Sequence, residues 1–134
     1  MQNVLTILTV VLFSILLGCG DKAITVSITP ITDISSSITL KRDSSSTCRV
    51  KLECEPGIYS DHISAEIRDS HGNRVPYEYA TSSIVSYRGA VTSANVTVAL
   101  HAYPTAPKGS FTLYVEADNQ GVKSTLNFPL KIVE

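Results

Sequence analysis

The chain divides into an apolar leader and a longer segment in which apolar and polar residues alternate. From Val4 to Leu17 the only polar side chains are Thr6, Thr9 and Ser14. An apolar run of this length is typical of an export signal, and it is shorter than the roughly 20 residues that a transmembrane helix needs. We therefore expect residues 1–18 to form an apolar signal-peptide helix that precedes the folded domain.

Beyond Lys22 the apolar residues recur with the two-residue period of β-strands, and no stretch sustains the period of a helix. The clearest run is Cys48–Cys54, in which every second residue is apolar and three charged residues occupy the other face. Alternation predicts strands, in chain order, within 24–29, 38–40, 48–54, 62–69, 74–79, 83–87, 94–101, 111–117 and 126–132.

Polar stretches between these runs predict turns. Ser35–Ser37 and Ser44–Thr47 are interpreted as solvated connections, Asp69–Asn73 as a hairpin loop and Asp118–Gly121 as the turn of the last hairpin. The run 83–87 is the weaker one, and without it the pattern predicts seven or eight short strands. Such a number of strands, with a turn roughly every 8 to 12 residues, is typical of an antiparallel sandwich of two sheets. The expected fold class is therefore all-β.

Two prolines refine the expected strand positions. Pro76 lies within the run 74–79 and Pro129 within the run 126–132. Because proline lacks a backbone donor, each is expected on an edge strand or at a bulge.

The order of segments resembles the bacterial immunoglobulin-like domains of cell-surface and secreted proteins. The closing residues 106–133 look like the last hairpin of those domains, where a proline–glycine–aromatic entry leads into a strand, a polar turn and a final strand. Phe111 occupies the place where those domains often carry Tyr. The resemblance covers 24–133 as a pattern of alternation and implies an immunoglobulin-like β-sandwich over 23–134. It implies little about chemistry, because this fold serves many functions.

Directly after the apolar run stands Leu16-Leu17-Gly18-Cys19, which resembles the lipobox of bacterial lipoproteins. The resemblance implies cleavage between Gly18 and Cys19, lipid on the thiol of Cys19 and a short lipidated tether over 19–22. Cys19 would thus attach the protein to a lipid bilayer of the bacterial cell envelope. The known inner-membrane signal resembles Asp directly after the cysteine, whereas here Asp21 comes one place later, which favours the outer membrane.

The extreme N-terminus departs from the usual export signal. Met1-Gln2-Asn3 contains no Lys or Arg, although positive charge normally orients insertion. An uncleaved apolar anchor therefore stays open as an alternative to cleavage. The pattern also fits a Gram-positive host.

Two cysteines remain after Cys19, and an even number in an exported protein suggests a disulfide. Cys48 and Cys54 are six positions apart on one strand face. Such a separation spans about 20 Å along a straight strand, whereas a disulfide requires Cα atoms within about 7 Å. No Gly, Pro, Asn or Asp between them allows a turn. We therefore predict no disulfide and two free, inward-facing thiols, and the same distance disfavours a metal site there.

Charge and motif content exclude several function classes. The 11 basic and 12 acidic residues leave a net charge of −1, so nucleic acid is not an expected partner. The sequence has no nucleophile elbow and no glycine-rich phosphate loop. We expect no catalytic residue, no metal and no cofactor. The three histidines have no Cys or carboxylate at ligand spacing and are interpreted as surface residues: His62, His71 and His101.

Some carboxylates invite a calcium interpretation. A calcium ion could be bound by a pair of carboxylates that met at one end of the sandwich, either Asp61 with Glu66 or Asp69 with Asp118. Salt bridges or solvation are the simpler interpretation.

Four of the six tyrosines form the candidate binding patch: Tyr77, Tyr79, Tyr87 and Tyr103. Tyrosine is rigid and amphipathic and is enriched where proteins contact partners. The patch would bind a protein or a glycan. In the alternative interpretation these side chains only cover half-exposed strand faces.

Three functions are compatible with these observations. The first is a membrane-anchored, non-enzymatic interaction module that binds an envelope protein or glycan. The second is a small phage- or plasmid-type lipoprotein that blocks a surface receptor or protects the envelope. The third, a hydrolase or metal-dependent enzyme, is disfavoured because no catalytic set is found.

Overall fold

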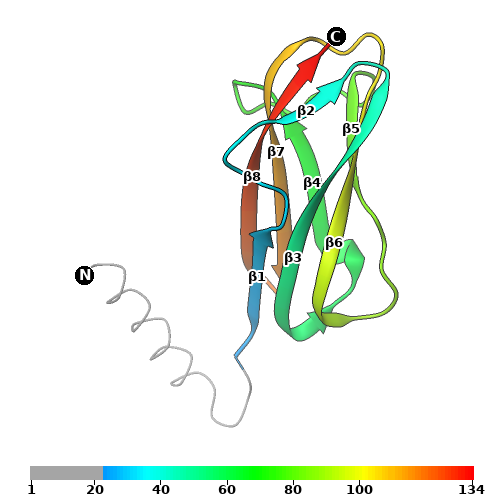
Figure 1. Cartoon of the computed structure of the whole chain (residues 1–134). Helices are drawn as coiled ribbons and strands as arrows, with labels where there is room; N and C mark the ends of the chain where they lie inside the picture. Colours follow the sequence, from blue (N-terminus) through cyan, green and yellow to red (C-terminus); the bar gives the residue numbers. More distant parts are fainter. Residues whose placement is uncertain (1–22) are drawn as a thin grey trace, which may run out of the picture.

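The computed structural model describes residues 23–134, which form two β-sheets packed face to face (Figure 1). The predicted signal peptide, the lipobox and the tether over 19–22 lie outside the described residues. The elements in chain order are β1 (Thr25–Pro30), β2 (Ile38–Lys41), β3 (Ser44–Ile58), the short 3-10 helix η1 (Ser60–His62), β4 (Ile63–Arg68), β5 (Ala80–Ile84), β6 (Val91–Ala102), β7 (Gly109–Asn119) and β8 (Val122–Val133). Residues 23–134 contain no helix long and apolar enough to cross a membrane.

Strand order identifies the fold. One sheet has the order β1-β3-β6-β5, and the other has the order β2-β8-β7-β4. All pairs are antiparallel except β2 with β8, which is parallel. With β2 set aside, the first, second, fifth and fourth strands face the third, sixth and seventh, which is the immunoglobulin arrangement. The predicted immunoglobulin-like β-sandwich is confirmed, with eight strands.

The core lies between the inner faces of the two sheets, where alternate residues of each strand meet. Its largest fully buried side chains include Phe128, Leu40, Leu52 and Leu100. Each such side chain contributes about 1.5–3 kcal/mol of hydrophobic stabilisation. All buried apolar residues of the described chain lie between Ile28 and Ile132. Residues 23–134 therefore contain a complete core and are expected to fold by themselves.

β3 is longer than the alternation indicated. The interpretation of Ser44–Thr47 as a turn is wrong, because these residues pair with the last four residues of β6. Hydroxyl side chains are compatible with a strand when a long neighbour supplies its hydrogen-bonding partners. At the other end the register shifts between Glu53 and Ile58. Gly57 allows the close approach of β6 there, since a Cβ would lie 3.0 Å from the Val91 carbonyl carbon and the backbone would have to shift.

The segment between β4 and β5 also differs from expectation. The predicted strand 74–79 is wrong, because only Arg74 makes a bridge, to Arg68. The carbonyl of Pro76 accepts hydrogen bonds from the amides of Tyr79 and Ala80, which turns the chain instead. β5 consequently begins three residues earlier than the predicted run 83–87.

The last hairpin matches its prediction closely. Its two-residue turn uses Gln120 and Gly121, with φ of 54° and 91°, and the Gly121 amide donates to Asp118 Oδ1 at 2.8 Å. Positive φ at both positions matches the twist of a hairpin. β2 pairs with β8 only from Leu130 onward, so Pro129 lies where β7 is the sole sheet neighbour, as its missing donor predicts.

Candidate functional site

The two ends of the sandwich carry different side chains. We call the end where β1 starts the tether end and the opposite end, which holds the C-terminus, the distal end (Figure 1). The tether end comprises Thr25, Ile58–His62, Arg88–Val91 and Asn119–Val122. The distal end comprises Lys41–Ser44, Asp69–Ala80, Tyr103–Lys108 and Glu134.

Three of the four candidate tyrosines lie at the distal end. Tyr77 and Tyr103 are 59% and 40% exposed, whereas Tyr79 is half-buried against the core. The Tyr103 amide donates to the Tyr79 carbonyl at 2.9 Å. The Arg74 guanidinium lies 4.3 Å from the centre of the Tyr77 ring, and His101 packs edge-on against Tyr103 with ring centres 4.6 Å apart. Tyr77 and Tyr103 are thus exposed aromatic side chains held by neighbours.

Tyr87 belongs to the tether end instead. Its hydroxyl donates to the Ile58 carbonyl at 2.9 Å. Desolvation, with smaller contributions from Cys54 and Asp61, raises the pKa of Tyr87 to about 12. The structure therefore separates Tyr87 from the other three candidates by the length of β6.

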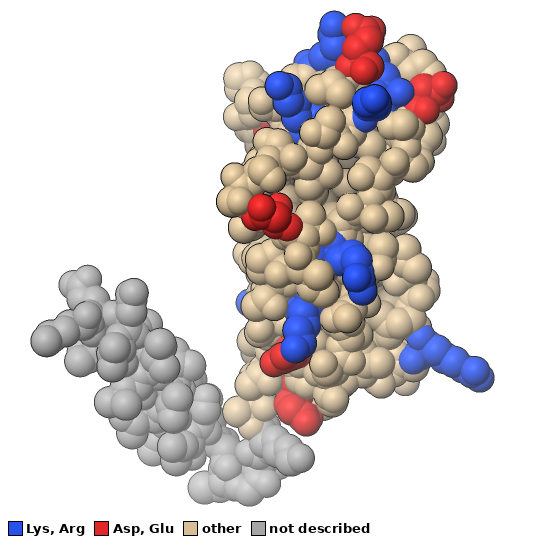
Figure 2. Space-filling view, viewed as in Figure 1, with Lys and Arg blue, Asp and Glu red and all other residues tan. Residues whose placement is uncertain are grey.

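Two ion pairs that share the Glu134 carboxylate lie at the distal end, as the distal tyrosines do. Arg42 donates to the Ala106 carbonyl at 2.7 Å and pairs with Glu134 at 3.1 Å. Lys108 pairs with the same carboxylate at 3.0 Å, and its hydrogen bond, with the neighbouring positive charges, lowers the pKa of Glu134. Figure 2 shows basic and acidic side chains interspersed at this end. Such mixed charge favours no strongly charged partner.

The histidines do not converge. His62 ends η1 at the tether end, while His71 lies in the exposed β4–β5 loop. His101 is half-buried on β6, where its Nδ1 and the Ser45 hydroxyl form a hydrogen bond of 2.8 Å. Within residues 23–134 no group of three or more His, Cys, Asp or Glu side chains is arranged to hold a metal ion.

The fold separates one of the two carboxylate pairs considered for calcium. Asp69 follows the distal end of β4 and Asp118 lies near the tether end of β7, because the two strands pair antiparallel. Asp69 and Asp118 therefore do not meet at one end, and the calcium alternative, which the sequence did not favour, does not hold for this pair. Glu66 pairs instead with Arg68 at 3.1 Å.

Both body cysteines lie in β3 with buried, free thiols. Cys54 Sγ donates to the Val91 carbonyl at 3.2 Å. Burial raises the pKa of Cys48 and of Cys54. The neutral thiol is a poor nucleophile and a poor metal ligand, so this environment is that of structural cysteines.

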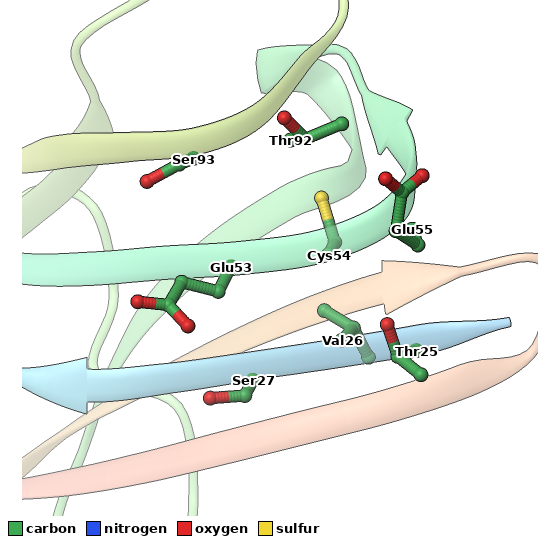
Figure 3. Close-up of a pocket in the computed structure, with 8 residues that line it drawn as sticks. All are labelled: Thr25, Val26, Ser27, Glu53, Cys54, Glu55, Thr92 and Ser93. Atoms are coloured by element: carbon green, nitrogen blue, oxygen red, sulfur yellow. The ribbon is translucent and has the colours of Figure 1, made fainter.

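A hollow of about 440 Å³ crosses β1, β3 and β6 near the tether end (Figure 3). Glu53 and Glu55 of β3 stand opposite Ser27 and Thr25 of β1. Glu53 pairs with Lys51 at 3.1 Å, and both side chains are at least half exposed. The two carboxylates are exposed to solvent beside hydroxyl groups. The residues that line the hollow include no histidine or basic group that would act with them in acid–base catalysis.

Asn119 is a buried polar residue that the sequence interpretation missed. It was expected in the exposed turn, yet it is 1% exposed. Its Nδ2 donates to the Thr25 carbonyl and to the Pro56 carbonyl, both at 2.9 Å. Asn119 thereby joins the start of β1, the end of β3 and the last hairpin. No sequence signal indicates that Asn119 is buried, because asparagine next to a glycine-containing turn is ordinarily an exposed turn residue.

No protein-family model matches the sequence, and no match is found among curated proteins. Solved structures do share the fold. The S-layer protein SbsC domains 4 and 5 are similar over 84% of this chain and 54% of that chain, with a TM-score of 0.53 and 13% identity. A family 123 glycoside hydrolase from Clostridium perfringens is similar over 84% of this chain and 28% of that chain, with a TM-score of 0.51 and 8% identity.

A chimeric titin Z1Z2 structure is similar over 84% of this chain and 98% of that chain, with a TM-score of 0.47 and 14% identity. The matched region thus spans about half of the S-layer structure and just over a quarter of the hydrolase. At these identities the similarity concerns the fold alone.

Proposed function

We propose that this chain is a lipid-anchored protein of the bacterial cell envelope that presents a non-enzymatic immunoglobulin-like module to an envelope protein or glycan. One observation carries the proposal. β1 begins at Thr25, six positions after Cys19, and the exposed Tyr77 and Tyr103 lie at the opposite end of the sandwich. An anchor at Cys19 leaves this aromatic end facing away from the bilayer. The residues after the cysteine favour the outer membrane.

The short tether restricts where the module acts. Six extended residues span at most about 20 Å, so the tether end stays close to the membrane surface. A strand of the length of β6 (Val91–Ala102) extends about 40 Å. The distal end therefore reaches partners within about 60 Å of the bilayer. Partners embedded in or attached to the same envelope layer lie within this distance.

The distal tyrosines suit a contact surface. Aromatic side chains at interface centres account for much of the binding energy, and pre-positioned ones lose little entropy. The contact of the Arg74 guanidinium with the face of Tyr77 and the edge-on contact of His101 with Tyr103 restrict both rings before a partner binds. We therefore narrow the proposed patch to Tyr77, Tyr79 and Tyr103.

The placement of the reactive side chains supports a non-enzymatic role. His62 lies at the tether end and His71 in the loop at the distal end. The thiols of Cys48 and Cys54 are buried, with raised pKa values. General acid–base and nucleophilic catalysis both require such groups within hydrogen-bonding reach of one another in an accessible site. Ser45 and His101 do meet this distance, at 2.8 Å, but no acidic side chain of the described residues pairs with His101 to orient it as a base.

Metabolic labelling with an alkyne fatty acid tests the anchor. The wild type is expected to incorporate the label, and Cys19→Ser is expected to lose it, because the thiol of Cys19 is the proposed attachment atom. Cys48→Ser is the matched control and keeps the label, since that thiol is buried in the core. Labelling of Cys19→Ser at the wild-type level would contradict the anchor.

Affinity capture of envelope components with the body, residues 20–134, tests the patch. The double variant Tyr77→Ala, Tyr103→Ala is expected to reduce capture at least about tenfold, because truncating exposed aromatic anchors removes more than 1 kcal/mol each. Tyr59→Ala is the matched control, as Tyr59 is 57% exposed at the tether end. If Tyr59→Ala reduces capture equally, or the double variant has no effect, the distal patch is wrong.

A further inference from the structure

Both sheets present an edge strand on the same side of the sandwich. β5 is the last strand of one sheet and β4 is the last strand of the other. A hollow of about 350 Å³ lies between them. We call it the side groove. Its lining is apolar and hydroxyl-rich, with Asp61 as the charged exception, and includes Ile63, Ala65, Ser82 and Ile84.

The backbone of β5 has hydrogen-bonding groups directed to this free edge. The Val85 amide donates to the Thr97 carbonyl at 2.9 Å. In an antiparallel pair, residues that bond to the neighbouring strand alternate with residues that do not. Ser83 therefore bonds to β6, and the N–H and C=O groups of Ser82 and Ile84 point away from it.

The facing edge of β4 is free only in part. The Val75 amide donates to the Ile67 carbonyl at 2.8 Å, so this segment covers the distal half of β4. By the same alternation the backbone groups of Ala65 also face outward. The side groove thus has free backbone donors and acceptors on both sides.

Of the other three edges of the described sandwich, β1 and β2 are protected and β4 is protected in part. On β1, the Ile28 amide donates to Ser124 Oγ at 3.1 Å, and the strand ends at Pro30. β2 is only four residues long and ends in a lysine. β4 carries the Glu66–Arg68 ion pair. β5 has neither charge nor proline, and the uncharged stretch continues to Tyr87.

Exposed edges usually carry charge, proline or a covering segment, because an open edge pairs with any available strand. We propose that the side groove binds an extended segment of another polypeptide, which adds to β5 as an additional strand. The chemistry of the groove specifies an uncharged segment with apolar side chains at alternate positions, which pack on Ile63, Ala65 and Ile84.

A second copy of this chain fits the groove less well, and this step rests on the proposed lipid anchor. Two identical edges form a closed dimer by antiparallel pairing, in which a two-fold axis reverses the strand direction. The two tether ends would then point in opposite directions. The five residues between Cys19 and Thr25 do not allow both copies to reach one bilayer. A segment of a different protein has no such constraint.

Selection from a displayed library of uncharged peptides of about six residues, the length of an ordinary strand, tests the groove on the body, residues 20–134. The selected peptide is expected to protect the amides of Ser82 and Ile84 from hydrogen exchange. Ser82→Pro removes one edge donor without removing a bond to β6, and the dissociation constant should rise at least about tenfold. Ser82→Ala keeps the donor and is expected to bind within about twofold of wild type.

Three results would overturn the proposal: no enriched peptide, equal affinity for Ser82→Pro, or protection confined to another edge. Circular dichroism checks that Ser82→Pro is folded, and Ser82→Ala separates the donor from the side chain. A dimer of the body that Ser82→Pro dissociates would replace the peptide with a second copy. Because these measurements use the unlipidated body, a failure of Cys19 labelling contradicts the anchor and leaves peptide binding to be decided separately.

Discussion

At the residue scale, the partly buried hydroxyl of Tyr87 makes the free energy of unfolding depend on pH. Its pKa is raised from 10.0 to about 12, so the folded state holds the hydroxyl proton more tightly than the unfolded chain does. The resulting stabilisation is complete below the unfolded value and is lost as pH rises through the folded value. The phenolic hydroxyl thus stabilises the fold only while it stays protonated.

The free energy of unfolding is therefore expected to fall between about pH 10 and about pH 12, and Tyr87→Phe should flatten this decline because it removes the titrating hydroxyl. Urea unfolding across this range measures the slope. The wild type, measured in parallel, supplies the reference slope. If Tyr87→Phe has the same slope as the wild type, the pKa of the Tyr87 hydroxyl is not raised by folding.

At the element scale, Asn119 connects three strands that the chain order keeps apart. Its two donated hydrogen bonds reach the start of β1 and the end of β3 from the end of β7. Asn119→Ala leaves two carbonyls without this donor and should lower the free energy of unfolding by about 2 kcal/mol. Denaturant titration checks this value. Asn127→Ala, at an exposed position of the same hairpin, should cost less than about 0.5 kcal/mol. Equal losses would contradict the bridging role.

Elements differ in how far their sequence determines them. Cys48–Cys54 and the last hairpin were predicted correctly because strict alternation allows only one face to be buried. Ser44–Thr47 was predicted wrongly because hydroxyl residues are common in both turns and strands, and the partner in β6 decides between them. The run 74–79 alternates equally well, yet the turn around the Pro76 carbonyl prevents a strand there.

At the scale of the whole molecule, the core protects the body thiols. Cys48 and Cys54 lie on an inner strand, so they become accessible only when the sandwich opens. A thiol reagent is expected to modify neither in the folded body and both after unfolding without a reductant. Modification in the folded state would contradict their burial, and its absence after unfolding would indicate a disulfide.

The sequence predicts the candidate site less well than it predicts the fold class. One patch is predicted from the sequence because four tyrosines are near one another along the chain: Tyr77, Tyr79, Tyr87 and Tyr103. The 12-residue β6 separates Tyr87 from the others, and no pattern of residues indicates which end of a sandwich a loop occupies. The side groove was equally invisible, since it depends on which strands become edges.

The sequence by itself determined the all-β class, the inward face of each regular strand and the lipobox-like segment, because these depend on local alternation and on composition. Only the tertiary structure decided the strand order, the burial of Asn119, the separation of the two ends and the free edge of β5. These features arise from pairing between segments far apart in the chain, and that pairing is selected by the packing of the whole core rather than by any one segment.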